Sequence, residues 1–154
     1  MKLYLVQHAE SKSEKMDPAR GLSEKGQADV KKVAAFLKTL RLVVEAIWHS
    51  GKTRAVQTAG ILGQAVSAKQ GVIQQNGLAP LDPVQPIQEK ISQVSEDLMI
   101  VGHLPFMGKL ASSLAAGSES ADAVAFRQGG VVCLERDDQG TWRVRWAVTP
   151  DLLG

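Results

Sequence analysis

The sequence contains little cysteine, no long apolar run and no large excess of either charge. Cys133 is the only cysteine among 154 residues, which excludes an internal disulfide framework. No apolar run approaches the roughly 20 residues that span a bilayer, and the four apolar residues after Met1 and Lys2 are too few for a signal peptide. Eighteen Lys and Arg against 16 Asp and Glu give a net charge of +2, so neither nucleic acid nor a membrane surface is expected as a partner. We therefore expect a cytoplasmic protein.

The length and composition favour one folded domain over residues 1–154. A chain near 150 residues buries about 68–70% of the surface that it exposes when unfolded, so it holds a core without disulfides or a metal. Hydrophobic residues make up 44% of the chain and charged residues 22%, as in ordinary globular domains. The sequence has no internal repeat, low-complexity tract or linker. We expect a monomer or a weak homo-oligomer.

Short apolar runs alternate with segments of helical periodicity over the first three quarters of the chain. The predicted strands cover residues 3–6, 43–48, 72–73 and 98–101. Ser23 is expected to cap the first predicted helix and Gly117 to end the last; these helices cover residues 23–41, 52–64, 87–94 and 105–117. This alternation predicts a three-layer α/β/α sandwich with a mostly parallel central sheet.

The last quarter of the chain has a different pattern, with two apolar segments joined by a turn. Residues 131–135 and 141–148 flank a turn rich in Asp and Gly, which predicts a closing β-hairpin. Strict alternation would place Trp142, Val144 and Trp146 on one face of the second strand, toward the core. The two intervening arginines would then point outward.

Each of the three histidines follows the end of a predicted strand. His8 comes after residues 3–6, His49 after Trp48, and His103 two residues after Val101. Ligands bind outside the carboxyl ends of the strands in open parallel sheets, so titratable groups there face a crevice. A single histidine at such a place is more often structural, and we assign His49 to that class. His8 and His103 together indicate a functional site.

Two arginines occur near predicted helix N-termini. Arg54 lies in the first turn of the helix over residues 52–64, and Arg20 lies just before the helix that Ser23 caps. Free backbone N–H groups and the helix dipole favour an anion at such places, and a guanidinium adds a planar set of donors that matches phosphate oxygens. Together with the histidines, these arginines indicate phosphate chemistry.

Four spaced motifs resemble those of the histidine phosphatase superfamily. They are L-Y-L-V-Q-H-A-E at 3–10, A-R-G-L-S-E-K-G at 19–26, S-G-K-T-R-A-V-Q-T at 50–58 and V-G-H-L-P at 101–105. They occur in the family's order over almost the whole chain, and the short chain is most similar to the SixA-type phosphohistidine phosphatases. The resemblance implies one phosphoglycerate mutase-like domain over residues 1–154. It also implies a phosphorylated substrate, either phosphohistidine in a signalling protein or a small phosphorylated molecule.

The resemblance assigns a role to each matching residue. His8 would be the nucleophile that takes the phosphoryl group, and His103 would stabilise the transferring oxygens. Arg20 and Arg54 would hold the phosphate, so no metal or other cofactor is expected. Gln7 stands where the family has arginine; its amide still donates hydrogen bonds, but it lacks the charge and the planar fork.

Two departures from the family leave the activity open. The change to Gln7 supports an alternative function, that of a weakened or inactive module that binds phosphate or a phosphoprotein. The acid that protonates the leaving oxygen in larger family members has no clear counterpart. Its candidates are Asp82, in a proline-rich loop where Asp commonly forms turns, and Glu10, close to His8. A phosphohistidine substrate tolerates a weak acid, because its leaving group is an imidazole nitrogen.

Two other enzyme classes fit the sequence poorly. Residues 46–53 end like a phosphate-binding P-loop, but the first glycine is missing, and Ile47, Trp48 and His49 are too bulky for backbone that wraps a phosphate. Three histidines resemble a zinc ligand set, but nearby arginines would repel the cation and the paired cysteines of zinc deaminases are missing. We therefore favour a phosphatase over an NTPase or a metal hydrolase.

Overall fold

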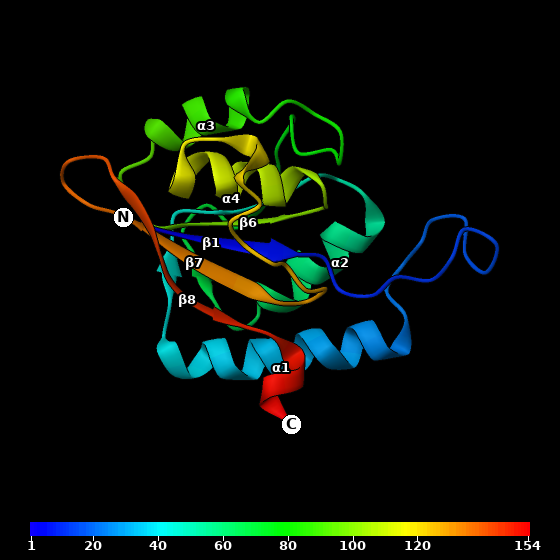
Figure 1. The fold of residues 1–154 in the computed structure, drawn as a ribbon. Helices are drawn as coiled ribbons and strands as arrows, with labels where there is room; N and C mark the ends of the chain where they lie inside the picture. Colours follow the sequence, from blue (N-terminus) through cyan, green and yellow to red (C-terminus); the bar gives the residue numbers. More distant parts are fainter.

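A six-stranded sheet forms the centre of the computed structural model, which describes residues 1–154 (Figure 1). Its strands are β1 (Lys2–Gln7), β3 (Ile47–His49), β5 (Val72–Gln74), β6 (Leu98–Gly102), β7 (Val131–Arg136) and β8 (Trp142–Val148). The spatial order is β5-β3-β6-β1-β7-β8. The first four strands are parallel, whereas β7 is antiparallel to β1 and β8 is antiparallel to β7. The predicted α/β fold with a mostly parallel sheet is confirmed.

Helices cover both faces of the sheet and give the molecule three layers (Figure 1). One face packs against α1 (Glu24–Leu40) and α2 (Thr53–Leu62), and the other against α3 (Gln85–Ser92) and α4 (Phe106–Ala116). Two short 3₁₀ helices, η1 (Glu119–Ala121) and η2 (Pro150–Leu153), complete the chain. None of the helices is both long enough and apolar enough to cross a membrane.

The strand β1 is buried on both faces, as its short apolar run predicts. Tyr4 and Val6 face the core beneath α1 and α2, whereas Leu3 and Leu5 face the core beneath α3 and α4. Side chains alternate across a strand, so a strand between two helical layers needs apolar residues at every position. This burial fixes the register of β1 and therefore the place where its last residues emerge.

Local signals set the ends of the long helices. The Ser23 hydroxyl accepts a hydrogen bond from the Gly26 backbone N–H at 3.0 Å and caps α1 as predicted, and Gly117 ends α4 in the left-handed conformation. Gly26 is also required by packing, because a Cβ there would lie 2.1 Å from the Glu10 carbonyl oxygen. The first turn of α1 is thereby held against the chain that leaves β1.

The predicted strand over residues 43–48 is wrong in one respect, since it forms two strands in two sheets. β2 (Val43–Val44) pairs with β4 (Ser67–Ala68) in a small separate sheet, and β3 joins the central sheet. Between them the Glu45 backbone N–H donates to the Asp97 carbonyl at 2.7 Å. The strand therefore changes partners at Glu45, and the single charged residue within this apolar segment does not by itself indicate the change.

The predicted common face for Trp142, Val144 and Trp146 is also wrong. A β-bulge lies between Cys133 and Leu134, so that Trp146 pairs with the first and Val144 with the second. An extra residue in one strand reverses the alternation beyond it. Trp146 consequently packs on the α1 side of the sheet, whereas Trp142 packs on the α4 side and Val144 is exposed.

Candidate active site

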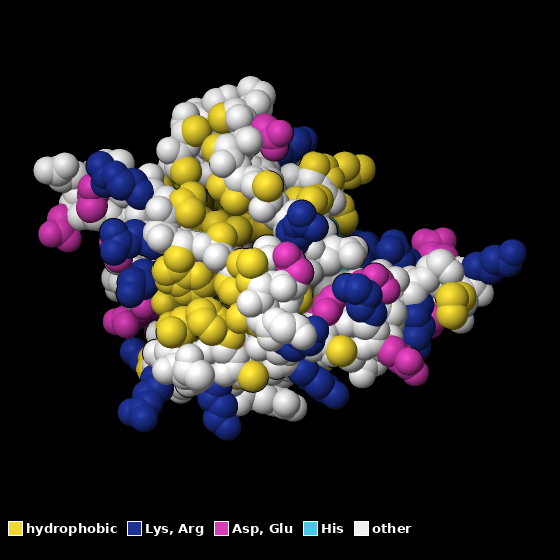
Figure 2. Space-filling model, turned by 60° about the horizontal axis from the view of Figure 1, so that its bottom comes forward, with side chains coloured by type: hydrophobic (Ala, Val, Ile, Leu, Met, Phe, Trp, Pro, Cys, Tyr) yellow, Lys and Arg dark blue, Asp and Glu magenta, His cyan; other side chains and the backbone are white.

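The three histidines lie at one edge of the sheet, where neighbouring parallel strands end. His8 follows β1, His49 ends β3 and His103 follows β6, and the three strands are adjacent in the order β3-β6-β1. The His8 backbone N–H donates to the Gly102 carbonyl at 2.9 Å, and the centroids of the His8 and His103 rings are 5.0 Å apart. All three histidines are buried, and none is visible on the face shown in Figure 2.

Hydrogen bonds orient the His8 ring and select its tautomer. The ring Nδ1 lies 2.7 Å from the Ala9 carbonyl oxygen, which can only accept, so Nδ1 carries the proton and Nε2 keeps a free lone pair. The Ala9 backbone N–H donates to the Thr58 hydroxyl oxygen at 3.1 Å, and this hydroxyl donates to the Arg54 carbonyl at 2.8 Å. Because Thr58 is fully buried in α2, this helix holds the chain at His8 in place.

Burial and nearby positive charge keep His8 neutral. Desolvation lowers the pKa of His8 below its usual value of 6.5, and the charges of Arg54 and Arg20 lower it further. The hydrogen bond to Ala9 acts in the opposite direction but is the smaller effect. At neutral pH the imidazole is therefore an uncharged base, which is the form that a nucleophile requires.

The turn that follows β3 contacts the His103 ring. Its Nε2 lies 2.6 Å from the Ser50 hydroxyl oxygen, whereas its Nδ1 is buried and has no hydrogen-bond partner. Burial, which is the largest effect, acts together with His8 and the cations Arg54, Lys52 and Arg20 to lower the pKa of His103 to about 3. His103 is thus a neutral ring next to the neutral His8 ring.

A polar cleft of about 340 Å³ lies between the β1–α1 loop and the N-terminus of α2. Its lining holds three cations, Arg20, Lys52 and Arg54, against a single carboxylate, Glu14. Burial and the charge of Arg20 lower the pKa of Arg54, so an anion bound beside these guanidinium groups would relieve an unfavourable interaction. The cleft is therefore suited to a phosphate group.

Arg20 is oriented by an uncommon backbone conformation. Its φ is 52°, in the left-handed region that few residues with side chains adopt. The guanidinium Nη2 donates to the Ser11 hydroxyl at 3.2 Å, and Nε donates to the Lys12 carbonyl at 3.4 Å. Strained backbone of this kind is common at binding sites, and here it directs the guanidinium toward the cleft that contains Arg54.

The buried side-chain polar atoms that lack a hydrogen-bond partner all belong to residues of this region. Gln7 Oε1, Arg54 Nε and His103 Nδ1 are the three buried side-chain nitrogen or oxygen atoms that have no hydrogen-bond partner. Gln7 is the last residue of β1, pairs with Gly102 and is only 8% exposed. Proteins rarely leave such atoms unpaired, so their concentration beside His8 marks a site that binds a polar ligand.

The two candidate acids, Glu10 and Asp82, and the third histidine, His49, all form hydrogen bonds within the fold. The Glu10 carboxylate accepts from the Ser23 hydroxyl at 2.9 Å, at the start of α1. The Asp82 carboxylate accepts from the Ala79 backbone N–H at 2.9 Å and stabilises the turn before α3. His49 accepts from the Gly51 backbone N–H at 3.0 Å through Nδ1, which agrees with its assignment as a structural histidine.

The structure adds four residues that the motif analysis did not assign. They are Glu14 and Lys52 in the cleft, Ser50 on the His103 ring, and Thr58 behind His8. Three of the four lie within the motif at residues 50–58, so the signal was present, but only the fold shows which side chains of the motif face the histidines. No group of three or more His, Cys, Asp or Glu side chains is arranged to hold a metal ion.

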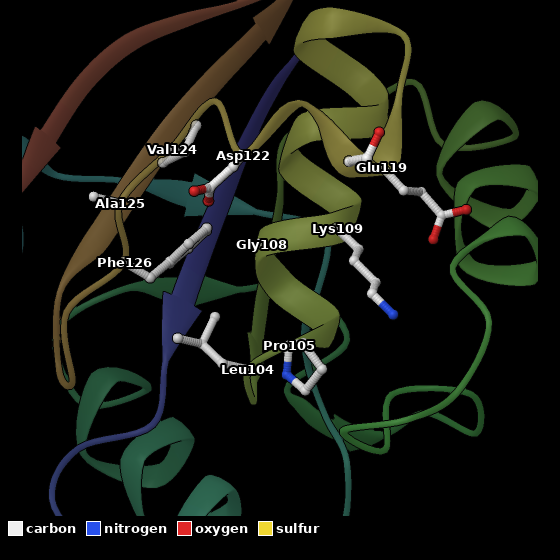
Figure 3. A pocket seen from close by; sticks show the side chains of 10 residues that line it. Leu104, Pro105, Gly108, Lys109, Glu119, Asp122, Val124, Ala125 and Phe126 are labelled. Atoms are coloured by element: carbon white, nitrogen blue, oxygen red, sulfur yellow. The ribbon is translucent and has the colours of Figure 1, made fainter.

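A second depression lies next to the site but has a different chemical character. This groove of about 440 Å³ runs between α4 and the segment around η1, and Leu104 and Pro105 lie at the end close to β1 (Figure 3). Its lining contains no histidine or arginine and is apolar around Phe126. The groove therefore adjoins His103 without offering the groups that phosphate transfer requires.

Comparisons with known proteins identify the family and support the fold. The sequence profile of the histidine phosphatase superfamily (branch 1) matches residues 3–82. An uncharacterised protein of Picosynechococcus sp. is 30% identical over 141 residues, which cover 87% of this chain and 84% of that protein. The structure of the protein histidine phosphatase SixA complexed with tungstate has a TM-score of 0.86 at 21% identity, with 100% of both chains covered. A phosphoserine phosphatase of Entamoeba histolytica, in complex with 3-phosphoglyceric acid, has a TM-score of 0.73 at 13% identity over 96% of each chain.

Proposed function

The chain belongs to the histidine phosphatase superfamily (branch 1), and on this basis we propose that it is a phosphatase that forms a phosphohistidine at His8 and acts on phosphohistidine in a signalling phosphoprotein. The observation that carries the proposal is the pair of neutral rings, His8 and His103, 5.0 Å apart beside the arginine-lined cleft. Phosphoryl transfer requires a nucleophile, a second group that stabilises the transferring oxygens, and an adjacent site that binds the anion.

The proposed reaction has two displacements. The lone pair of His8 Nε2 attacks the phosphorus atom of the substrate, the bond from phosphorus to the substrate imidazole breaks, and the phosphoryl group moves to His8. Water then attacks the phosphorus of this intermediate, the bond to His8 Nε2 breaks, and inorganic phosphate leaves. Throughout, His8 Nδ1 keeps its proton and donates a hydrogen bond to the Ala9 carbonyl, so the ring presents Nε2 in each cycle.

Arg20, Arg54 and His103 are proposed to stabilise the charge that spreads over the transferring oxygens. Their donors are placed before substrate arrives, because the fold holds Arg54 at the start of α2 and His103 at the end of β6. Preorganised donors of this kind are each worth about 10²–10³ in rate. The proposal needs no metal ion, since the guanidinium groups supply the positive charge.

The choice of phosphohistidine over a phosphate monoester rests on the leaving group. The alkoxide that leaves a phosphate monoester must be protonated by a well-placed general acid. A substrate imidazole that is protonated on its other nitrogen leaves as a neutral ring and needs no such acid. Glu10 and Asp82 already accept hydrogen bonds from Ser23 and Ala79, and Glu14 is an exposed carboxylate in the cleft. Such a carboxyl set suits a leaving group that demands little acid catalysis.

The surroundings of the cleft support a protein substrate. The β1–α1 loop projects from the body of the molecule (Figures 1 and 2) and carries Met16, which is 78% exposed. The loop between β5 and α3 leaves the same edge of the sheet and carries Leu81, which is 85% exposed. Exposed apolar side chains on two loops that leave the same edge of the sheet as His8 favour contact with a macromolecule over a small polar phosphate.

A trapping experiment tests the proposal. The enzyme is mixed with a protein labelled with ³²P on histidine, quenched in alkali, and assayed for acid-labile label on the enzyme. We expect label on the wild type and on His49→Asn, which retains an acceptor for the Gly51 amide, and no label on folded His8→Ala. Label on His8→Ala, or turnover in it, would refute the nucleophile.

The alternative function is a module that binds phosphate or a phosphoprotein without turnover, and Gln7 is the observation that favours it. An amide at the end of β1 supplies no positive charge where the family has arginine. The module predicts saturable binding of inorganic phosphate with neither acid-labile label nor phosphate release in the wild type. The trapping experiment therefore separates the two functions.

A further inference from the structure

Ser50 is the residue whose hydroxyl contacts the His103 ring, and its hydrogen bonds determine which ring nitrogen is protonated. The Ser50 oxygen lies 2.6 Å from His103 Nε2 and also accepts from the Lys52 backbone N–H at 3.3 Å. Lys52 is the N-cap residue of α2, so this hydroxyl joins the start of α2 to the end of β6.

Counting hydrogen bonds distinguishes the two neutral tautomers. If Nε2 carried the proton, the Ser50 oxygen would accept from both Nε2 and Lys52. The hydroxyl hydrogen of Ser50 and the buried Nδ1 lone pair of His103 would then both have no partner in the chain. If Nδ1 carries the proton, the Ser50 hydroxyl donates to Nε2 and only the Nδ1–H group is unpaired. The second arrangement leaves one group without a partner in the chain instead of two, and polar groups are costly when unpaired at a buried ring such as His103 or a half-buried hydroxyl such as that of Ser50.

We propose that Ser50 is a positioning residue, which holds His103 in the Nδ1–H tautomer so that Nδ1 donates to an oxygen of the phosphoryl group transferring to His8. The inference rests on the proposed function for the identity of the acceptor. The tautomer itself follows from the contacts of the resting protein.

The chemistry explains why this tautomer matters. A phosphoryl oxygen is an acceptor, so it is stabilised by an N–H group and repelled by the lone pair of an unprotonated nitrogen. A neutral imidazole rotates or changes tautomer readily when nothing selects one form. A hydroxyl that donates to one nitrogen assigns the proton to the other. His103 therefore acts as a donor without becoming positively charged.

His49 provides an internal reference for this assignment. Its Nδ1 accepts from the Gly51 backbone N–H, so its own proton lies on Nε2. The structure thus predicts opposite tautomers for two buried histidines at neighbouring strand ends, and the His8 tautomer matches that of His103.

The first test measures the tautomers directly. Long-range ¹H–¹⁵N correlation spectra of the ¹⁵N-labelled full chain at pH 7.5 are expected to show His8 and His103 protonated on Nδ1, and His49 protonated on Nε2. In Ser50→Ala the His103 signals should move toward the averaged values of two tautomers, whereas the His49 assignment is retained. A wild-type His103 that carries its proton on Nε2 would overturn the proposal, whatever the activity.

The second test uses turnover of the phosphohistidine protein. Ser50→Ala is expected to lower kcat about tenfold to hundredfold, as loss of a supporting hydrogen bond typically does, with a smaller change in KM. Ser50→Thr keeps the hydroxyl and should restore most of the rate, and Ser112→Ala, which removes a buried hydroxyl bonded to the Ala123 amide, should leave kcat unchanged. An unchanged kcat in folded Ser50→Ala would also overturn the proposal.

The two tests distinguish failure of this inference from failure of the proposed function. A wild type that lacks phosphatase activity but shows Nδ1-protonated His103 would contradict the phosphatase and retain the role of Ser50 in selecting the tautomer. If Ser50→Ala does not fold, the wild-type spectrum and the rate of Ser50→Thr still decide the matter. A Ser50→Thr rate as low as that of His103→Ala, in a folded protein, would count against the proposal.

Discussion

Replacing Gln7 by arginine separates a weakened phosphatase from a binding module. Gln7 ends β1, is 8% exposed, and has an Oε1 atom with no hydrogen-bond partner. It precedes His8, the proposed nucleophile, and its neighbour across the sheet, Gly102, precedes His103. An arginine here has only donors, so it removes the unpaired acceptor and places a guanidinium beside the transferring phosphoryl group.

The expected gain follows from two opposing effects. A hydrogen bond to a charged group contributes about 1.5–3 kcal/mol, which corresponds to roughly 10-fold to 150-fold in rate. Against this, the position is buried and directly precedes His8, whose pKa the charges of Arg54 and Arg20 already lower. A third guanidinium would therefore be repelled until substrate binds. We expect a net increase of about tenfold in the rate of the first phosphoryl transfer, or about 1.4 kcal/mol.

Single-turnover dephosphorylation and the affinity for inorganic phosphate are the two measurements. Gln7→Arg is compared with Gln139→Arg, which adds the same charge in the exposed turn between β7 and β8, and with Gln7→Met, which removes the amide at similar size. We expect a faster rate only in Gln7→Arg and a slower one in Gln7→Met. An unchanged or lower rate in folded Gln7→Arg would refute the placement of Gln7 against the phosphoryl group. Tighter phosphate binding without turnover in either form would favour the binding module.

Three further predictions concern stability, substrate and metal. The pKa of His103 is about 3 in the fold and about 6.5 when unfolded, so the unfolded chain binds the extra proton as pH falls below 6.5, and stability is lost over that range. Between pH 8 and pH 5 the wild type should lose about 2 kcal/mol more than His103→Asn in urea unfolding, and equal losses would contradict the burial effect. Met16→Asp and Leu81→Asp should lower kcat/KM for the phosphohistidine protein severalfold and leave phosphoramidate hydrolysis unchanged. The matched control Leu152→Asp, at a 69% exposed leucine in η2, should change neither, and equal effects on both substrates would argue against a protein-binding rim. Activity should persist in EDTA, because arginines supply the positive charge at the site; a loss restored by Mg²⁺ or Zn²⁺ would show a metal requirement.

Much of the fold was predictable because its signals are local. The cap at Ser23, the end of α4 at Gly117 and the buried run of β1 each depend on residues within a few positions. The split between β2 and β3 and the bulge between Cys133 and Leu134 were missed. The split and the bulge both depend on which distant strand pairs with the segment. The apolar pattern of the segment does not identify that partner.

The candidate site likewise has a part that local signals predict and a part that depends on contacts between distant residues. Its histidines and arginines are recognisable from the ends of predicted strands and the starts of predicted helices. The supporting contacts are not, because Ser50 and His103 are 53 residues apart in the chain and Ala9 and Thr58 are 49 apart. The hydrogen bonds of Glu10 with Ser23 and of Asp82 with Ala79 likewise became evident only from the folded backbone.

By itself, the sequence determined that His8 and His103 each emerge just beyond a buried strand, with Arg20 and Arg54 near helix N-termini, because strand length and helix start are properties of short segments. Only the tertiary structure decided that β6 lies beside β1, which brings the two rings within 5.0 Å of each other. It also decided which ring nitrogens are protonated, because each proton is assigned by whatever donor or acceptor the packed strands and helices place against the ring. The order of the strands is the one that buries both apolar faces of the sheet under helices. It depends on all strands and helices together, so no single segment encodes it.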